Sequence, residues 1–370
     1  MAEATSKKEK IPLWLDCDPG HDDAFAILFA AYHPALHLLG ISTGYGNASL
    51  DRTTSNALSI REAIGRPDIP VIPGTRKPFS REAHHAPEIH GESGLDGTDF
   101  LPSPTTSALR CNAIVDMYEA LMACPPHTAW LVTTGPLTNA ALLFTTFPNM
   151  VDHLGGLSIM GGAVGTNFTH ANLGRPFRDA SGQTRERIGN HTPYAEFNIW
   201  CDPESAQSIF SNPRLSSKTT LITLDLTHQV FATESVRHLV LYSTKDEDRQ
   251  NSGRSTRLRR MFYELLIFFA STYADVFGLT DGPPLHDPLA VAVLLAEYGD
   301  GQTRIGFDDR GRERFRIEVE LTEPELGRTR ISAASEGVRI PRSLDTPRFW
   351  KILEECLERA DAQVGRIPVL

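Results

Sequence analysis

The sequence is poor in cysteine, and its cysteines form no pattern that carries chemistry. There are five in 370 residues, they are widely scattered, and no two form a CxxC pair. A disulfide framework or a zinc site would need even numbers or close pairs, so neither is expected. Scattered free cysteines fit a reducing compartment, and we expect a cytoplasmic protein.

Long apolar runs and a secretory signal are also missing. The longest apolar runs, such as 265–270, are far too short to span a bilayer. Residues 1–10 are polar and carry several lysines, without the apolar stretch of a signal peptide. We therefore expect no membrane partner, and a disordered tail over 1–10 ahead of one folded domain over 11–370.

Positive charge is in short supply as well. Lys and Arg total 36 against 46 for Asp and Glu, which gives a formal net charge of −10. A nucleic-acid-binding surface normally shows a basic face, so no nucleic-acid partner is expected. A phosphate-binding loop is disfavoured too, because the glycine-containing turn at 133–139 lacks the GKS/T ending.

What the sequence does contain is a regular alternation of strand-like and helix-like segments. Strands are predicted at 11–15, 36–42, 71–72, 129–133, 157–160 and 220–224. Helices are predicted at 24–31, 53–64, 107–123, 137–144, 203–210 and 347–360. Such repeated units predict an α/β fold with a mixed, mainly parallel sheet flanked by helices, and a site at the carboxyl ends of its strands.

Three further segments do not fit this alternation. Residues 166–189 are polar and rich in Gly, Arg and Thr, and are interpreted as an inserted loop. The charged run 245–260 reads as a solvated loop or the start of a helix. Residues 303–333 contain alternating β-rich pieces and predict a small antiparallel addition.

Four carboxylates crowd the end of the first predicted strand, in the stretch DCDPGHDD. They belong to Asp16, Asp18, Asp22 and Asp23. Like charges at this density repel, and hard oxygen ligands clustered in this way suit Ca²⁺ or Mg²⁺. The spacing is not that of an EF-hand loop. The simpler alternative is that one of the last two aspartates caps the following helix.

Three other stretches carry groups suited to a polar ligand. In HDP, Asp287 could cap a helix or complete a cation site, and His286 could protonate a leaving group. The polar run 190–198 offers donors and acceptors for a polyhydroxylated molecule, but could be an ordinary loop. The turn at 133–139 could direct a backbone carbonyl at a metal, and the glycine-rich turn 90–97 is expected near the site.

Taken together, these segments resemble the inosine-uridine preferring nucleoside hydrolase family. The similar blocks occur in order along nearly the whole chain: DCDPGHDDA at 16–24, GYGN at 44–47, HGESGLDG at 90–97, TTGPLTNAA at 133–141, MGGA at 160–163, TPYAEFNIWCDPESA at 192–206 and DGPPLHDPLA at 281–290. The insertion at 166–189 is the visible departure from the family pattern. It could cover the site, contribute to an interface or lie in solvent, and it leaves the limits of the base pocket open.

The resemblance implies a nucleoside hydrolase-like domain with a tightly bound Ca²⁺. The implied metal ligands are Asp18, Asp23, Asp287 and the backbone carbonyl of Thr134. The implied substrate contacts are Asp22, Asn198 and nearby Asn47 for the ribose 2′ and 3′ hydroxyls, Asn190 and Glu196 for the 5′ hydroxyl, Met160 and Phe197 as pocket lining, and His90 near the base. Tyr263 and Tyr273 could stack on the base or belong to the core.

The implied reaction is hydrolysis of the N-glycosidic bond of a ribonucleoside to free base and ribose. Asp18 would take a proton from water activated by the metal, and His286 would be the acid toward the leaving base. The family also implies a homodimer or homotetramer acting in nucleoside salvage.

Three rival functions follow from the same residues. A catalytically idle nucleoside- or ribose-binding protein should have lost one of the matched acidic positions, yet all are present. A phosphatase of the aspartate-dependent kind should carry a small hydroxylated residue after the DxD, where this chain has Pro19-Gly20-His21. A phosphorylase would need an anion site, which the local acidity disfavours.

Overall fold

The computed structural model describes residues 9–243, 255–298, 301 and 303–369. Most of the expected tail 1–10 and the first part of the charged run 245–260 therefore lie outside the described residues. At the centre is a six-stranded sheet in the order β3-β2-β1-β4-β5-β8. Its strands are β1 (Ile11–Cys17), β2 (Leu36–Thr43), β3 (Val71–Pro73), β4 (Trp130–Thr133), β5 (Gly156–Met160) and β8 (Thr219–Ile222).

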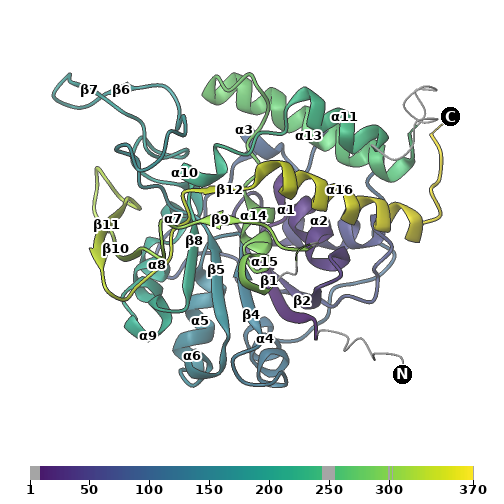
Figure 1. Cartoon of the computed structure of the whole chain (residues 1–370), viewed down its shortest axis with the longest axis horizontal. Helices are drawn as coiled ribbons and strands as arrows, with labels where there is room; N and C mark the ends of the chain where they lie inside the picture. Colours follow the sequence, from purple (N-terminus) through teal and green to yellow (C-terminus); the bar gives the residue numbers. More distant parts are fainter. Residues whose placement is uncertain (1–8, 244–254, 299–300, 302, 370) are drawn as a thin grey trace.

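All neighbouring strands of this sheet run parallel. The antiparallel pairs of the described chain form separate two-stranded sheets, β6 (Phe177–Arg178) with β7 (Thr184–Arg185), β9 (Phe307–Asp308) with β12 (Ser343–Leu344), and β10 (Arg314–Val319) with β11 (Thr329–Ala334). The expected α/β fold with a mainly parallel sheet is confirmed. The antiparallel addition expected at 303–333 is the β10–β11 pair, at the side of the molecule in Figure 1.

Helices cover both faces of the sheet and enclose two hydrophobic cores. One core contains α1 (His21–Tyr32), α2 (Leu50–Ala63), α13 (Arg257–Phe277), α14 (Asp287–Ala292) and α16 (Thr346–Gln363). The other contains α4 (Ala113–Met122), α5 (Thr138–Thr146), α6 (Met150–His153), α8 (Pro203–Phe210) and α9 (Pro213–Ser216). Shorter helices are α3 (Pro87–His90), α7 (Phe197–Cys201), α10 (Leu224–Thr227), α11 (Glu234–Tyr242) and α15 (Leu295–Tyr298). No helix of the described residues is long and apolar enough to cross a membrane.

Helix α1 explains how the acidic end of β1 is held in place. Every residue from 21 to 30 is buried, and a helix that is apolar on all sides needs cover on all sides. The sheet lies on one side of it, and α14 and α16 supply cover on others. The first turn of α1, with its two aspartates, is therefore fixed from several directions.

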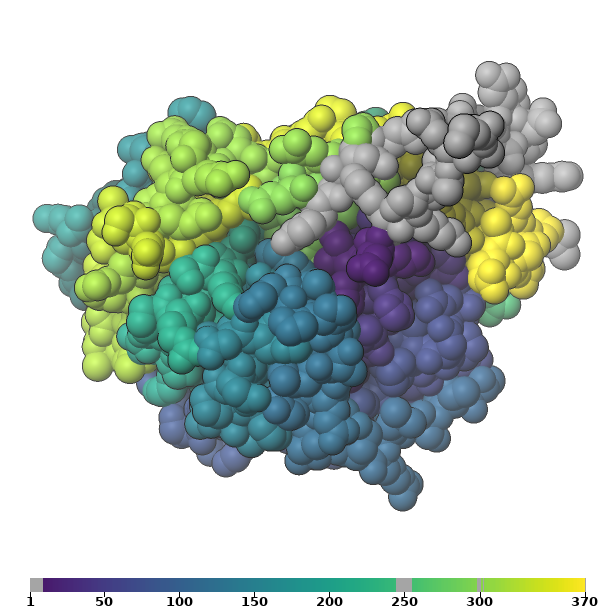
Figure 2. Space-filling view, turned by 60° about the horizontal axis from the view of Figure 1, so that its bottom comes forward, coloured from purple at the N-terminus to yellow at the C-terminus, as the bar shows by residue number. Residues whose placement is uncertain are grey.

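The strand order creates the crevice in which ligands of such sheets bind. The chain runs from β1 outward to β2 and β3, and then returns to the other side of β1 as β4. Helical connections consequently leave the sheet in opposite directions between β1 and β4, at the carboxyl ends of these strands. Figure 2 shows another side of the molecule, where the purple start of the described chain reaches the surface beside blue segments from the first half of the chain.

Two observed boundaries, one of a helix and one of a strand, differ from the predicted ones. The helix expected from 107 begins at Ala113, because the side chain of Asn112 accepts hydrogen bonds from the backbone N–H groups of Ile114 and Val115 and so caps the first turn. The strand expected to reach 224 ends at Ile222, since Leu224 already starts α10.

Candidate active site

The polar segments expected at strand ends meet around one deep pocket of about 440 Å³. Asp18 follows β1, Asn47 follows β2, Thr134 follows β4, and Met160 ends β5. Of the residues predicted for the site, those that line the pocket are Asp22, Asn47, His90, Thr134, Met160, Asn190, Glu196, Phe197, Asn198, His286 and Asp287. Asp18 and Asp23 are fully buried beneath this lining.

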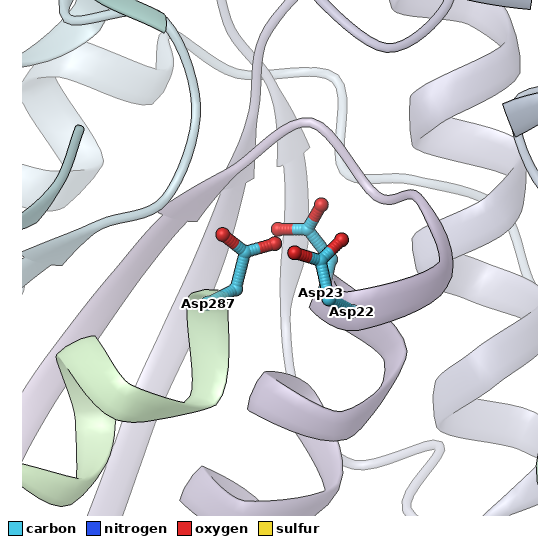
Figure 3. A group of neighbouring side chains, drawn as sticks. All are labelled: Asp22, Asp23 and Asp287. Carbon is cyan, nitrogen blue, oxygen red and sulfur yellow. The ribbon is translucent and has the colours of Figure 1, made fainter. Parts of the chain in front are cut away.

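Three carboxylates converge at the base of the pocket. Asp22 and Asp23 come from the first turn of α1, and Asp287 from the first turn of α14 (Figure 3). One oxygen of each lies within 4.8 Å of the others. Because Ca²⁺ binds oxygens at about 2.3–2.6 Å, two of its ligands can be up to about 5 Å apart. The separation of the three carboxylates therefore fits one such ion.

Asp18 lies beside this trio and has an unused oxygen. Its Oδ2 accepts a hydrogen bond from the backbone N–H of Asn47 at 2.7 Å. Its Oδ1 is buried and has no hydrogen-bond partner among the described residues. A Cβ at Gly46 would come within 1.9 Å of Oδ2, and one at Gly135 within 2.5 Å of Oδ1. Both glycines are thus required for the chain to close around this carboxylate.

The pKa values of the cluster indicate that its carboxylates need a positive charge beside them. Burial raises the pKa of Asp22 to about 7, and burial together with the other carboxylates raises the pKa of Asp18 and of Asp287 well above the ordinary value. The pKa of Asp23 is raised by burial too. Four buried carboxylates keep their charge only beside positive charge. Hard oxygen donors, one of them without a partner, fit a divalent cation such as Ca²⁺.

A hydrogen-bond network holds the trio and the expected carbonyl ligand. The hydroxyl of Thr134 donates to Asp23 Oδ1 at 2.8 Å, and the backbone N–H of Gly20 donates to Asp23 Oδ2 at 3.0 Å. The side-chain amide of Asn198 donates to the backbone carbonyl of Thr134 at 2.8 Å. That carbonyl therefore lies at the site, with Asn198 as its partner in this structure.

Glu196 and Asn190 form the polar wall next to α7. Glu196 caps α7: its Oε1 accepts from the N–H of Asn198 at 2.9 Å, and its Oε2 accepts from those of Ile199 at 3.0 Å and Gly162 at 2.9 Å. The Oδ1 of Asn190 accepts from the N–H of Phe197 at 3.0 Å. The Asn190 side chain also hydrogen-bonds Tyr273. Because an amide nitrogen carries two N–H donors, one of them can still donate to a ligand hydroxyl.

His286 lies in the pocket wall with both ring nitrogens engaged. Nδ1 is 2.7 Å from the hydroxyl of Thr227, and Nε2 is 2.7 Å from the hydroxyl of Tyr273. Burial lowers the pKa of His286 well below its usual range, and burial raises that of Tyr273. The imidazole is thus neutral and the phenol protonated near neutral pH. His286 and Tyr273 thus form one hydrogen-bonded pair in the pocket wall, and His286 as the acid toward the base stays a prediction.

The sequence left open whether Tyr263 and Tyr273 contact the ligand or belong to the core, and the structure places only Tyr273 at the pocket. Tyr273 is buried and lines the pocket. Tyr263 lies nearer the start of α13, and the guanidinium of Arg260 is 6.0 Å from its ring. Tyr263 does not line the pocket.

The insertion forms part of the pocket mouth, one of the three placements that the sequence left open. Arg175, Phe177 and Arg187 line the pocket, and the β6–β7 pair projects beyond it (Figure 1). The base of the insertion is anchored to the segment after β8. Asp225 accepts from the N–H groups of Val164 at 2.7 Å and Gly165 at 2.9 Å. Polar composition alone gave no signal for this placement.

The fold and the pocket define an α/β protein with a polar pocket above a carboxylate cluster that could hold a metal ion. Residues 13–351 match the family described as inosine-uridine preferring nucleoside hydrolase. The chain belongs to this family, which confirms the resemblance seen in the sequence and the expected class of enzyme, a nucleoside N-ribohydrolase.

Individual relatives agree with this assignment. The chain is 37% identical to a uridine nucleosidase of Saccharomyces cerevisiae, over 95% of this chain and 97% of the relative. It is 37% identical to a pyrimidine-specific ribonucleoside hydrolase of a Shewanella species, over 77% of each chain. Among solved structures, a plant nucleoside hydrolase superposes with a TM-score of 0.73 at 25% identity, covering 94% of this chain and 98% of that one.

Proposed function

We propose that the protein hydrolyses the N-glycosidic bond of ribonucleosides, uridine among them, with Ca²⁺ as its metal. The observation that carries the proposal is the set of buried carboxylates at the base of the pocket, in which Asp18 keeps an oxygen without a partner. The names of the two relatives at 37% identity, which refer to uridine and to pyrimidine ribonucleosides, support the choice of substrate.

The residues divide the reaction between two sides of the pocket. Bound Ca²⁺ would supply the charge that polarises the attacking water and the ribose hydroxyls. The free Oδ1 of Asp18 is the acceptor for the proton of that water. Asp18, Asp23, Asp287 and the backbone carbonyl of Thr134 would hold the ion, with Asp22 beside them. The negative charge of these carboxylates favours the cationic character that ribose acquires as the C1′–N bond breaks.

The other side of the pocket assists the departing base. As the electrons of the C1′–N bond move onto the base, the base takes a proton from the hydroxyl of Tyr273, which is held by His286. Oxygen from water bonds to C1′, so the products are ribose and the protonated base. The proton accepted by Asp18 balances the one that the base removes.

Ribose orientation is assigned to the polar wall. Asp22, Asn47 and Asn198 would bind the 2′ and 3′ hydroxyls, and Asn190 and Glu196 the 5′ hydroxyl, because all of them line the pocket next to the carboxylates. Met160, Phe197 and His90 would contact the remainder of the nucleoside. The homodimer or homotetramer and the cytoplasmic setting stay predictions.

The deciding experiment measures free ribose released from uridine, cytidine and inosine in phosphate-free buffer, with and without added Ca²⁺. We expect release that needs no phosphate and that is fastest for a pyrimidine nucleoside. Release only in the presence of phosphate would indicate a phosphorylase. Tight nucleoside binding without ribose release, in folded and Ca²⁺-loaded protein, would identify an idle binding protein.

A further inference from the structure

A second buried imidazole stands behind His90, outside the set of residues that the proposed reaction uses. It belongs to His21, the first residue of α1, which is fully buried. Its Nδ1 lies 3.1 Å from Nδ1 of His90, and its Nε2 lies 2.8 Å from the backbone carbonyl oxygen of Asp96. The close approach of the His90 ring requires Gly20, where a Cβ would meet His90 Nδ1 at 2.6 Å.

These two contacts determine where the protons of both rings lie. A carbonyl oxygen only accepts, so Nε2 of His21 must carry a proton to bond Asp96. A neutral imidazole carries one ring proton, which leaves Nδ1 of His21 bare. The contact of 3.1 Å between the two Nδ1 atoms then requires that His90 donate from its Nδ1. His90 is left with a bare Nε2, which is an acceptor.

The opposite arrangement would need a buried cation. The backbone N–H of His21 points at His90 Nδ1 at 3.4 Å, and a bare Nδ1 there would require His21 to carry protons on both nitrogens. The ring of His21 is fully buried and lies parallel to the rings of Phe268 and Phe269, at 5.0 and 5.4 Å between centroids. No carboxylate of the described residues forms an ion pair with it. An unpaired charge in such surroundings is costly. The arrangement with neutral rings, protonated at His21 Nε2 and His90 Nδ1, is therefore favoured.

The bare nitrogen of His90 belongs to the pocket. His90 lines the pocket, its Nδ1 edge is turned toward His21 and Gly20, and no hydrogen bond from another described residue reaches its Nε2. A ligand in the pocket can therefore donate a hydrogen bond to this nitrogen.

We propose that His21 is a positioning residue that fixes His90 Nε2 as a hydrogen-bond acceptor, so that the pocket selects bases presenting an N–H group to it. The proposal rests on the proposed function and names its selectivity. The ligand class is a nucleobase with an imide or amino N–H, such as the N3–H of uracil. His90, with no proton on that nitrogen, does not protonate the leaving base.

A first test reads the protons directly in full-length, Ca²⁺-loaded protein. Nitrogen-15 NMR of the histidine rings, with His90→Gln to assign the signals, should show a protonated Nδ1 and a bare Nε2 for His90. A protonated Nε2 in the wild type would overturn the proposal. This measurement needs no turnover, so it remains decisive even if no ribose is released and the proposed function fails.

A second test uses two variants of His21 that differ in one property. His21→Gln keeps an acceptor for His90 and a donor for Asp96, whereas His21→Phe keeps the ring shape and removes both. Discrimination between uridine and 3-methyluridine in kcat/KM should persist in His21→Gln. In His21→Phe it should shrink roughly five- to tenfold, the equivalent of about one hydrogen bond.

The control substrate is a nitrophenyl riboside, which offers no N–H and needs no proton to leave. Turnover of this substrate and the rise in melting temperature on adding Ca²⁺ should be unchanged in both variants, which shows that the site is intact. Equal discrimination in wild type, His21→Gln and His21→Phe would overturn the role of His21.

Discussion

The hydroxyl oxygen of Tyr273 lies 2.7 Å from Nε2 of His286, and this contact joins α13 to the residue that precedes α14. Both side chains line the pocket. Burial keeps the phenol protonated and the imidazole neutral, as the directions of their pKa shifts show. Loss of either partner should therefore affect the same step, the protonation of the departing base.

Tyr273→Phe and His286→Ala should each lower kcat for uridine and inosine by about 10²-fold or more, in the range of general acid catalysis. A nitrophenyl riboside needs no such proton and should be turned over at nearly the wild-type rate, which steady-state kinetics would measure. If His286 alone protonates a purine, His286→Ala should reduce turnover of inosine more than that of uridine. Equal small effects on all three substrates would make the pair a packing contact.

Asp18→Asn should abolish the acceptor for the water proton and leave the fold intact. We expect kcat to fall by about 10²–10⁴-fold, measured as ribose release at saturating uridine and Ca²⁺. The matched control is Asp16→Asn, two residues earlier and on β1. Asp16 is as deeply buried, but its Oδ1 accepts from Ser42 at 2.5 Å and from Asn139 at 2.8 Å, away from the pocket lining. Near-normal kcat in Asp18→Asn would exclude Asp18 as the base.

Removal of the cation should lower activity and stability together. An ion bound only by the native state stabilises it by about 2.7 kcal/mol at a free concentration one hundred times Kd. Prolonged chelation should thus lower the melting temperature and stop ribose release, and Ca²⁺ should restore both. Asp287→Asn should need more Ca²⁺ for the same melting temperature, whereas exposed Asp99→Asn should not. Chelated protein with unchanged melting and turnover would contradict the metal site.

Stability should also fall in acid because of buried neutral histidines. Burial lowers the pKa of His228 from 6.5 to about 4. Between these values the unfolded chain binds more protons than the native one, so stability rises with pH and levels off above about 6.5. His228→Gln should reduce the total loss of stability between pH 6.5 and pH 4 by up to about 3 kcal/mol, measured by denaturation at fixed Ca²⁺. Exposed His37→Gln is the control, and an equal slope in all three proteins would argue against the assignment.

The insertion should influence binding more than chemistry. Phe177 packs edge-on against Tyr194, with ring centroids 5.2 Å apart, and lines the pocket. Phe177→Ala should raise KM for nucleosides several-fold with little change in kcat. Arg185→Ala is the matched control on the same hairpin, because Arg185 is exposed, pairs with Asp179 and does not line the pocket. Equal KM values for the two variants would remove the insertion from the binding surface.

Much of the fold was predictable because its signals are local. The acidic stretch 16–23 follows an apolar run, and parallel strands bring their carboxyl ends to one edge, so the meeting of Asp18, Asn47 and Thr134 follows from topology. Asp287 follows no strand of this sheet, and only the family resemblance implied its place beside Asp23. The choice between Tyr263 and Tyr273 was not predictable from periodicity. Ten residues along a helix turn a side chain by about 280°, and only tertiary packing decides which direction faces the ligand.

The position of the insertion was beyond prediction for a related reason. Residues 166–189 have no apolar periodicity, so their sequence does not predict which face of the segment is buried or what it packs against. Contacts with residues distant in sequence place it, including the bond of 2.8 Å between His228 Nδ1 and the carbonyl of Asn172. The bare nitrogen of His90 is equally hidden in the sequence, since it depends on a second histidine 69 residues away.

The insertion has a consequence for how such an enzyme can change. Its hairpin shapes the mouth of the pocket, while the carboxylates lie at the starts of α1 and α14 and are braced by the sheet. The hairpin at the pocket mouth is thus separate in sequence from the residues that would break the N-glycosidic bond. Mutations that lengthen, shorten or change the charge of the hairpin can alter which molecules enter the pocket. Natural selection can thus change the substrate range while the catalytic residues stay the same.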